Sequence, residues 1–399
     1  MARKYLHEVD MMRVFFIFGV LLNHTTTAFI QQMSSGGATR TALLGSHLLI
    51  HFTRMGFMFM TGLVLTLNYY HRHQWDRFFQ KRFAGSGWPY LLWTGLYLGL
   101  AILIGAPSYH WATFWSDYAD MILHGNAWYM YYILITLQLY LAFPLIVWLF
   151  KHIKHHEWLL GISFLLQLSI VTWIKYIMPG VDRSQWLWWF RAYGVNIFTY
   201  QFYFMLGAYT SIHYQQVTHW VTAHLRELTI ASVTLGIGTI PYYFGNRVVL
   251  GLDHTHAVSP HQPYMLVYDI IVILAVFGLG QKFAAWRANG MPTWFATAVH
   301  NAAIVSFGVY LDQTLALSVL RGALSLMTLP DWVWVILIPV GYGAVLAMAV
   351  GIAWFCYKVP PFGLLIGRPQ WHVLARNRRK KMPEKIIPSN SQTAKNVTE

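Results

Sequence analysis

Stretches of about 20 mostly apolar residues follow one another along almost the whole of this 399-residue chain. A helix needs ~20 such residues to cross the hydrocarbon core of a bilayer. Inside a bilayer, only helices and closed barrels satisfy their own backbone hydrogen bonds. Charged residues make up 11% of the chain, whereas soluble proteins carry charge on about a quarter of their residues. The sequence therefore predicts an all-α, polytopic membrane protein with no room for a separate soluble domain.

Hydropathy and turn residues predict about ten transmembrane helices joined mostly by short connections. Residues 1–367 form the predicted transmembrane domain, and residues 368–399 form a basic tail that is predicted to be disordered. The 19 Trp residues, many of them beside Tyr, suit the interfacial belts of a bilayer. The predicted helices are 12–30, 42–70, 88–106, 127–150, 158–177, 194–212, 227–245, 264–281, 300–320 and 333–357.

Lys and Arg residues concentrate in every second connection and in the tail. The positive-inside rule then places both termini in the cytoplasm, and an even number of helices agrees with this. The net charge of +14 is thus mainly an orientation signal, so nucleic-acid binding is not expected. No cleavable signal is recognised, and the first apolar segment is expected to stay in the mature protein. The one cysteine, Cys356, excludes an intramolecular disulfide.

The first predicted helix carries ionisable groups where lipid is expected. Arg13 is followed by nine apolar or Gly residues and then by Asn23, His24 and three threonines. Arg13 and His24 are eleven residues apart, about three turns or ~16 Å along a helix, so they share one face. Ionisable groups inside a membrane usually mark the working site. The alternative is that Arg13 anchors the helix end and His24 bonds to a neighbouring helix.

The second predicted helix places three further ionisable groups on one face. His47, His51 and Arg54 stand at positions i, i+4 and i+7, at a depth similar to that of His24. Asp312 in the ninth predicted helix is a candidate ion-pair partner for Arg54. Such groups on neighbouring helices indicate a polar cavity rather than isolated contacts between helices.

A basic segment follows the second predicted helix and is expected to be a cytoplasmic loop. It contains Arg72, Arg77, Lys81 and Arg82. Its first role is to fix orientation, but it also suits a soluble co-substrate that bears phosphates. Arg binds such groups bidentately, and Lys binds them as a point charge.

Two weaker clusters lie on the predicted outer side. His254, His256 and His261 lack a clear set of metal ligands, so no metal is expected. Trp128, Tyr129 and the aromatic residues beside them open the fourth predicted helix and form either an interfacial belt or a surface for sugar rings. The sequence has no Walker loop, no G-x-S-x-G motif and no H-E-x-x-H motif.

Taken in order along the chain, these residues resemble the membrane acyltransferase-3 family. The spacing of Arg13 and His24 is similar to the family's first-helix signature, and the likeness covers nearly the whole chain. The other similar segments are Met55–Gly62 for the F-F-x-x-S-G stretch, Lys81 and Arg82 before Trp88-Pro89-Tyr90 for the K-R…P motif, Trp128-Tyr129 with Tyr140 and Pro144 for the W…Y…P helix, and Ser306–Leu311 for the S-F-G-I-Y-L segment.

Within the family, two features most resemble the intercellular-adhesin branch, which is associated with poly-β-1,6-N-acetylglucosamine. These are the Glu8…Arg13…His24 opening and the Asn68-Tyr69 pair. Members of this branch are described either as exporters or as O-acyltransferases. The chain departs from the family pattern at Gln313, where many members have His, and at Gly85, where many have a second Arg.

The resemblance implies transfer of an acyl group, usually acetyl, from cytoplasmic acyl-CoA to a hydroxyl of an extracytoplasmic polysaccharide. The expected location is the plasma membrane, and the expected partners are the bilayer, acyl-CoA, the polysaccharide acceptor and a polysaccharide synthase. Within this scheme the candidate catalytic residues are Arg13, His24, Arg54 and Asp312. The candidate acyl-CoA residues are Arg13, Arg77, Lys81 and Arg82, and the candidate substrate residues are His47, His51, Trp128 and Tyr129.

The expected chemistry assigns His24 as a general base on the acceptor hydroxyl, or as a nucleophile that carries the acyl group. Arg54, with His47 or His51, would stabilise the oxyanion, and Asp312 would orient one of these groups. Polysaccharide export without chemistry is the main alternative, and proton-coupled transport of a small solute is another. Loss of His24 separates them, because an exporter tolerates it better than an enzyme that needs a base.

Overall fold

The computed structural model describes residues 5–72 and 74–368, and this part of the chain contains helices and no strands. It confirms the all-α, polytopic class. Within it, eight helical segments are long and apolar enough to cross a membrane. The predicted basic tail lies outside the described residues from position 369 onward. The predictions of ten spans and of cytoplasmic termini stay predictions.

Each of the ten predicted helices overlaps a helix of the structure. The connections between these helices contain further short helices, and one of them, at residues 114–124, is amphipathic. The α-helices are α1 (His7–Ile30), α2 (Ala38–Ser46), α3 (Phe52–Tyr69), α4 (Trp75–Leu103), α5 (Phe114–His124), α6 (Tyr131–His152), α7 (His156–Tyr176), α8 (Trp188–Arg191), α9 (Gln201–Ile212), α10 (Tyr214–Ala223), α11 (Leu225–Val248), α12 (His254–Ala257), α13 (Pro263–Ala288), α14 (Thr293–Ser325) and α15 (Asp331–Lys358).

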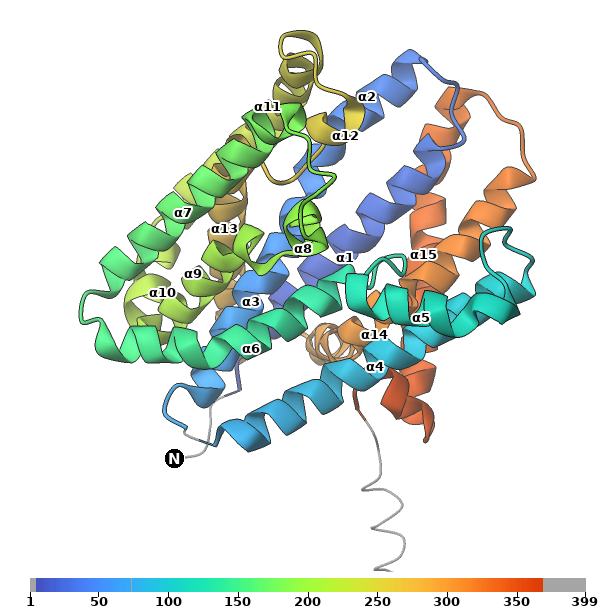
Figure 1. Ribbon diagram of the computed structural model, residues 1–399. Coiled ribbons are helices and arrows are strands. Elements are labelled where there is room, and N and C mark those ends of the chain that lie inside the picture. Colours follow the sequence, from blue (N-terminus) through green and yellow to red (C-terminus); the bar gives the residue numbers. More distant parts are fainter. Residues whose placement is uncertain (1–4, 73, 369–399) are drawn as a thin grey trace, which may run out of the picture.

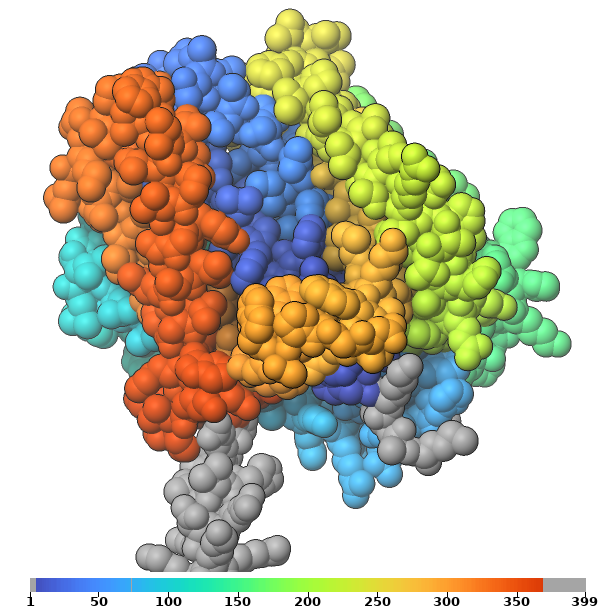
Figure 2. Space-filling model, turned by 180° about the vertical axis from the view of Figure 1, so that it is seen from behind, coloured from blue at the N-terminus to red at the C-terminus, as the bar shows by residue number. Residues whose placement is uncertain are grey.

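Helix α1 lies in the middle of the bundle and packs against α3, α13, α14 and α15 (Figure 1). Helices α7, α9, α10, α11 and α13 stand on one side of it, and α4, α5, α14 and α15 stand on the other. Seen from behind, the dark blue side chains of α1 are recessed between orange α15 and yellow-green α11 (Figure 2). Because α1 is surrounded by these helices, its polar residues can face protein instead of lipid.

The predicted helix 42–70 is interrupted in the structure. A 3₁₀ segment, His47–Ile50, separates α2 from α3. A 3₁₀ turn has 3.0 residues instead of 3.6, so it shifts the helical phase of the residues around it. The i, i+4, i+7 stripe predicted from a regular helix is therefore wrong in detail, and His47 points elsewhere than His51 and Arg54, as described below.

The predicted helix 194–212 is also broken. Two short 3₁₀ segments, Tyr193–Val195 and Ile197–Thr199, precede α9. The Asn196 side chain accepts a hydrogen bond from the Phe198 amide at 2.8 Å, and the Thr199 hydroxyl donates to the Tyr193 carbonyl at 2.9 Å. Asn and Thr side chains that bond to nearby backbone compete with helix formation. Non-helical backbone at membrane depth is tolerated where protein buries it.

Helix α4 begins 13 residues before the predicted helix 88–106. The basic segment is therefore largely helical: Arg77, Lys81 and Arg82 lie on α4, and the predicted loop is confined to the turn near Arg72. Helix α4 is absent from the eight long, apolar segments, since even its later part is interrupted by Gly, Trp and Tyr residues, and α9 is absent because it has 12 residues.

Helices α3 and α9 pack through two glycines that face each other's backbone. A Cβ atom on Gly62 would overlap the Phe204 carbonyl, and one on Gly207 would overlap the Phe59 carbonyl. Small residues allow this close approach of transmembrane helices. Gly62 is the glycine of the F-F-x-x-S-G-like stretch, so the structure supplies a packing reason for that residue. The contact fixes α3, which carries Arg54, against the rest of the bundle.

We expect Gly207→Ala to destabilise the protein by about 1–3 kcal/mol or more, because the added methyl group forces two backbones apart. Gly351→Ala is the matched control. Gly351 lies in α15 with nothing within 4 Å of an added Cβ, and Ala is favoured over Gly in a helix by ~1 kcal/mol. Thermal unfolding in detergent, followed by tryptophan fluorescence, measures both variants. Equal unfolding temperatures for the two would contradict this packing account.

Candidate active site

A cavity of about 930 Å³ lies among α1, α3, α4, α6 and α14 and reaches residues 366–368 after α15. Most of the sequence-predicted site residues meet in it. Those that line it are Arg13, His24, His51, Arg54, Lys81, Arg82 and Tyr129, whereas Arg77, His47, Trp128 and Asp312 do not. The cavity therefore joins the basic start of α4 to the polar residues of α1 and α3.

Arg54 is held by two tyrosines. Its Nη1 atom donates to the Tyr200 hydroxyl at 3.3 Å, and its guanidinium carbon lies 4.9 Å from the centre of the Tyr131 ring. The Tyr200 hydroxyl in turn donates to the Gly194 carbonyl at 2.8 Å. The ion pairs of the described residues are all His–Asp contacts, so Arg54 has no carboxylate partner there. Its positive charge is available to an anion in the cavity.

Asp312 does not form the expected pair with Arg54. It is fully buried in α14, and neither carboxyl oxygen has a hydrogen-bond partner in the structure. Tyr310, two residues earlier, lines the cavity. Positions i and i+2 lie on different faces of a helix, so Asp312 points away from it. Nothing in its surroundings supports a role in orienting the catalytic groups.

His24 lies beneath an aromatic ring. The centres of the His24 and Tyr129 rings are 4.0 Å apart at an interplanar angle of 32°. The Tyr129 hydroxyl accepts a hydrogen bond from Arg321 Nη2 at 3.1 Å, and its carbonyl accepts one from the Tyr310 hydroxyl. Both partners come from α14. Tyr129 is thus fixed beside the candidate base, at a place where it can contact an acceptor.

Trp128 and Tyr129 lie in the turn before α6, not on the predicted helix 127–150. Trp128 has a φ of 48°, a left-handed conformation that is rare for a residue with a side chain. This turn directs the two side chains differently. Trp128 packs near Tyr97, with ring centres 5.4 Å apart, and is not in the cavity lining. The structure therefore supports Tyr129 but not Trp128 as a substrate contact.

His47 and His51 differ in the same way. His47 Nε2 is 3.0 Å from the Thr27 hydroxyl, and this contact joins α1 to the 3₁₀ segment outside the cavity lining. His51 lines the cavity, as does Asn23. His51 Nε2 and Asn23 Oδ1 have no hydrogen-bond partner among the residues that the structure describes. Buried polar atoms normally have partners, so these two are suited to bind a hydroxyl or amide of a ligand.

The opposite end of the cavity is basic. Arg13, Lys81, Arg82 and Arg368 line it, and none of them forms an ion pair in the described part of the chain. Arg82 is positioned by Tyr69: its Nη2 donates to the Tyr69 hydroxyl at 3.4 Å, and its guanidinium lies 5.1 Å from the ring centre. Arg77 lies one turn away on α4, where it donates to the Gln74 side chain.

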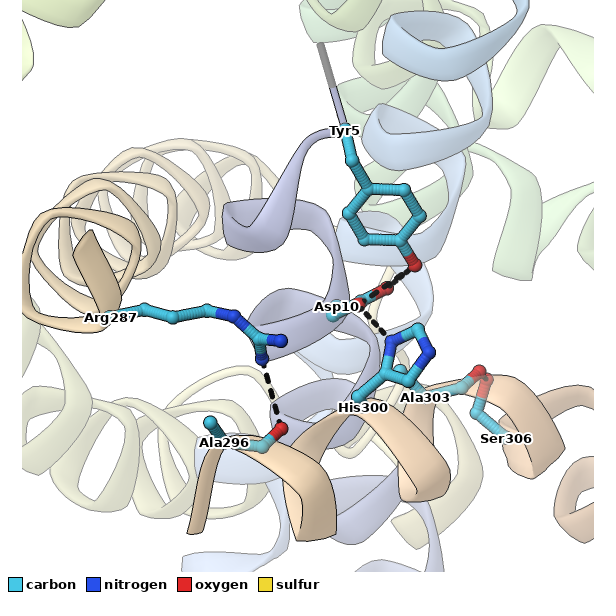
Figure 3. A network of polar contacts seen from close by, with 7 residues as sticks. All are labelled: Tyr5, Asp10, Arg287, Ala296, His300, Ala303 and Ser306. Carbon is cyan, nitrogen blue, oxygen red and sulfur yellow. Dashed lines mark hydrogen bonds and ion pairs between the residues drawn. The ribbon is translucent and has the colours of Figure 1, made fainter. Parts of the chain in front are cut away.

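A polar network around Asp10 fixes the start of α1 (Figure 3). The Tyr5 hydroxyl lies 2.9 Å from both carboxyl oxygens of Asp10, and His300 Nδ1 of α14 is 3.1 Å from Asp10 Oδ2. Partial burial and the hydrogen bond to Asp10 raise the pKa of Tyr5 to about 12. Tyr5 therefore keeps its proton at neutral pH and can donate to the carboxylate. Asp10 shares its charge among Tyr5, His300 and the nearby Arg13, and it is one carboxylate beside the four basic side chains at this end of the cavity.

Several residues of the site were not predicted, namely Asn23, Tyr131, Tyr200 and Arg368. Tyr131 belongs to the aromatic cluster beside Trp128, so a role beyond an interfacial belt was readable there. Tyr200 lies directly before α9 and after Thr199. Thr is a residue type that often bonds to backbone near a helix start, and this was the one local sign of a turn there. Arg368 was assigned to the tail, and only the folded chain brings it to the cavity.

The three histidines between α11 and α13 do not converge. His256 Nδ1 is 2.7 Å from Asp253 Oδ2, His254 Nδ1 is 3.1 Å from the Tyr243 hydroxyl, and His261 Nε2 is 3.4 Å from the Tyr200 hydroxyl. Within residues 5–72 and 74–368, no group of three or more His, Cys, Asp or Glu side chains is placed to hold a metal ion.

Comparison with protein families identifies one match that covers residues 6–358, to a family described as an acyltransferase domain. The match begins before α1 and ends with α15, so it includes the whole cavity apart from residues 366–368. No solved structure matches the chain significantly.

Comparison with curated proteins finds distant relatives in Staphylococcus aureus. A probable poly-β-1,6-N-acetyl-D-glucosamine export protein of strain MRSA252 is 23% identical over 239 residues, which are 58% of this chain and 62% of the relative. The protein of the same description in strain MSSA476 is 24% identical over 236 residues, with the same coverage of both chains. The chain thus spans about three fifths of the length of the curated relatives that it matches.

Proposed function

This chain belongs to the acyltransferase-3 family of multi-pass membrane proteins, and from that premise we propose that it moves an acyl group from acyl-CoA to a hydroxyl of a cell-surface polysaccharide. The acetyl group is the acyl group proposed first. The donor would enter from the basic, cytoplasmic end of the cavity, and the acceptor would approach His24 from the other end.

One observation carries the proposal, namely that one cavity contains both Arg13 and His24. Their separation of eleven residues on α1 corresponds to ~16 Å. A donor held by its phosphates at Arg13, Lys81 and Arg82 therefore needs an extended arm to bring its thioester to His24, and an acyl-CoA has such an arm. The volume of about 930 Å³ lies at the upper end of the usual range for small-molecule sites.

His24 and Arg54 supply the proposed chemistry. His24 accepts the proton of the acceptor hydroxyl while the oxygen attacks the thioester carbonyl. Arg54 stabilises the resulting oxyanion, which collapses as the C–S bond breaks, and the leaving thiolate takes the proton that His24 accepted. The alternative is that His24 attacks first and carries the acyl group. Gln313, where many family members have His, is buried and donates to the Tyr310 carbonyl at 2.8 Å, so the scheme uses one histidine.

The polysaccharide acceptor is proposed from the relatives, whose descriptions refer to poly-β-1,6-N-acetyl-D-glucosamine. Asn23, His51 and Tyr129 provide polar and aromatic groups of the kind that bind sugars. The same descriptions favour a second candidate function, export of a related polymer without chemistry. Export needs a path for a polymer, whereas the ring of Tyr129 lies directly beside His24, which favours transfer to the acceptor there. A synthase of the polymer is the proposed partner in either case.

The test compares a deletion strain with the same strain carrying the wild-type gene. We expect the wild type to restore O-acyl ester on the surface polysaccharide, because ester formation requires the enzyme. Ester content is measured after mild alkaline release, and polymer amount is measured in parallel. If deletion lowers polymer at the surface but leaves the ester content per sugar unchanged, export replaces acyl transfer as the function.

A further inference from the structure

The segment after α15 returns to the cavity. A 3₁₀ segment, Phe362–Ile366, follows α15, and the indole of Trp93 in α4 donates to the Leu365 carbonyl at 2.9 Å. Gly367 has a φ of 66°, and a Cβ atom on it would overlap the Gly85 carbonyl. Only glycine fits a position that combines a positive φ with such close backbone contact. Arg368 follows directly, so its backbone is placed by these contacts.

Arg368 adds charge to a place that is already positive. It lines the cavity with Arg13, Lys81 and Arg82. The charges of Arg82 and Arg368 act unfavourably on Arg13, and the single carboxylate of Asp10 acts favourably on it. Gathering like charges at one end of a cavity costs free energy. An anionic ligand with more than one negative charge recovers that cost, because each cation can then pair with it.

Gly85 leaves room for this arrangement. It lines the cavity on α4, and nothing lies within 4 Å of a Cβ atom built on it. A side chain at position 85 would therefore find open space in the cavity that Arg368 also lines.

We propose that Arg368, delivered by the turn at Gly367, is a donor-binding residue that occupies the place left open by Gly85 and binds the phosphates of the acyl donor. The inference rests on the proposed function, and it adds one residue, Arg368, to those that contact the phosphates of the donor. It assigns the first residue after the predicted transmembrane domain to the site instead of to the tail.

Binding of coenzyme A to the purified, full-length protein in detergent tests the proposal. We expect Arg368→Ala to weaken binding about tenfold or more, because a charge-assisted hydrogen bond is lost. Gly85→Arg in the Arg368→Ala background is expected to restore the affinity to within about threefold of the wild type. Lys358→Ala is the matched control, because Lys358 lies 4.8 Å from the Trp354 ring centre, outside the cavity lining, and its loss changes net charge equally.

The outcomes separate the two proposals. If the wild type binds coenzyme A and Arg368→Ala binds it equally well, Arg368 has no such role, although the proposed function stands. If Lys358→Ala weakens binding as much as Arg368→Ala does, the effect is one of net charge and the inference is overturned. Failure of Gly85→Arg to restore binding would show that the two positions do not serve one ligand. If the wild type itself does not bind coenzyme A, the donor in the proposed function is wrong.

Discussion

His24→Ala is expected to reduce acyl transfer by at least about 100-fold, because general-base catalysis by a positioned side chain contributes 10²–10⁴-fold. The variant is measured with purified protein, radiolabelled acetyl-CoA and isolated surface polysaccharide. Coenzyme A binding should stay within about threefold of the wild type, since the basic end of the cavity lies ~16 Å away along α1. A loss of rate without a loss of donor binding places the defect in the chemical step.

His47→Ala is the matched control for this experiment. His47 is also a histidine of the predicted cluster, yet it contacts Thr27 and does not line the cavity. We expect its rate to remain within about threefold of the wild type. If both variants lose activity equally, the loss reflects a general disturbance of the bundle, and His24 has no special part. Incubation of the wild type with labelled donor alone distinguishes a general base from a nucleophile at His24, because only a nucleophilic histidine would retain the labelled acyl group.

The fold class was predictable because a bilayer leaves few choices. A chain with long apolar segments must form helices there, and each predicted segment overlaps one. The details depended on tertiary contacts. The breaks at His47–Ile50 and before α9 replace regular helix by 3₁₀ turns, and hydropathy does not detect them. The same holds for the early start of α4, whose polar residues read as a loop.

The candidate site was partly predictable for a similar reason. Arg13 and His24 lie on one regular helix, so their spacing gave their common face directly. Arg54 and Asp312 lie on helices distant in sequence. Which face of α14 lines the cavity, that of Tyr310 or that of Asp312, is decided only when α14 packs in the bundle. Trp128 and Tyr129 are neighbours whose directions depend on one residue with a φ of 48°. Turns of this kind have no clear signature in a single sequence.

Arg54→Met provides the second large effect, an expected loss of 10²–10³-fold in kcat. Removing one partner of a buried ion pair usually destabilises a protein, because the remaining charge is left unpaired. Arg54 forms no ion pair among the described residues, and the buried carboxyl that its charge reaches, Asp269, keeps its hydrogen bond from the Tyr203 hydroxyl. The Tyr200 hydroxyl keeps its hydrogen bond to the Gly194 carbonyl. We therefore expect the unfolding temperature to change little while the rate falls.

Two further variants test whether the guanidinium itself is needed. Arg54→Lys keeps the charge but lacks the planar fork that contacts both Tyr131 and Tyr200, so an intermediate rate is expected, about tenfold or more below the wild type. Tyr200→Phe removes the hydrogen bond at 3.3 Å but leaves Arg54 over the Tyr131 ring, and a smaller loss is expected. A wild-type rate in Arg54→Met would show that this charge does not stabilise the transition state. The oxyanion would then have to be stabilised by uncharged donors of the cavity lining, such as His51.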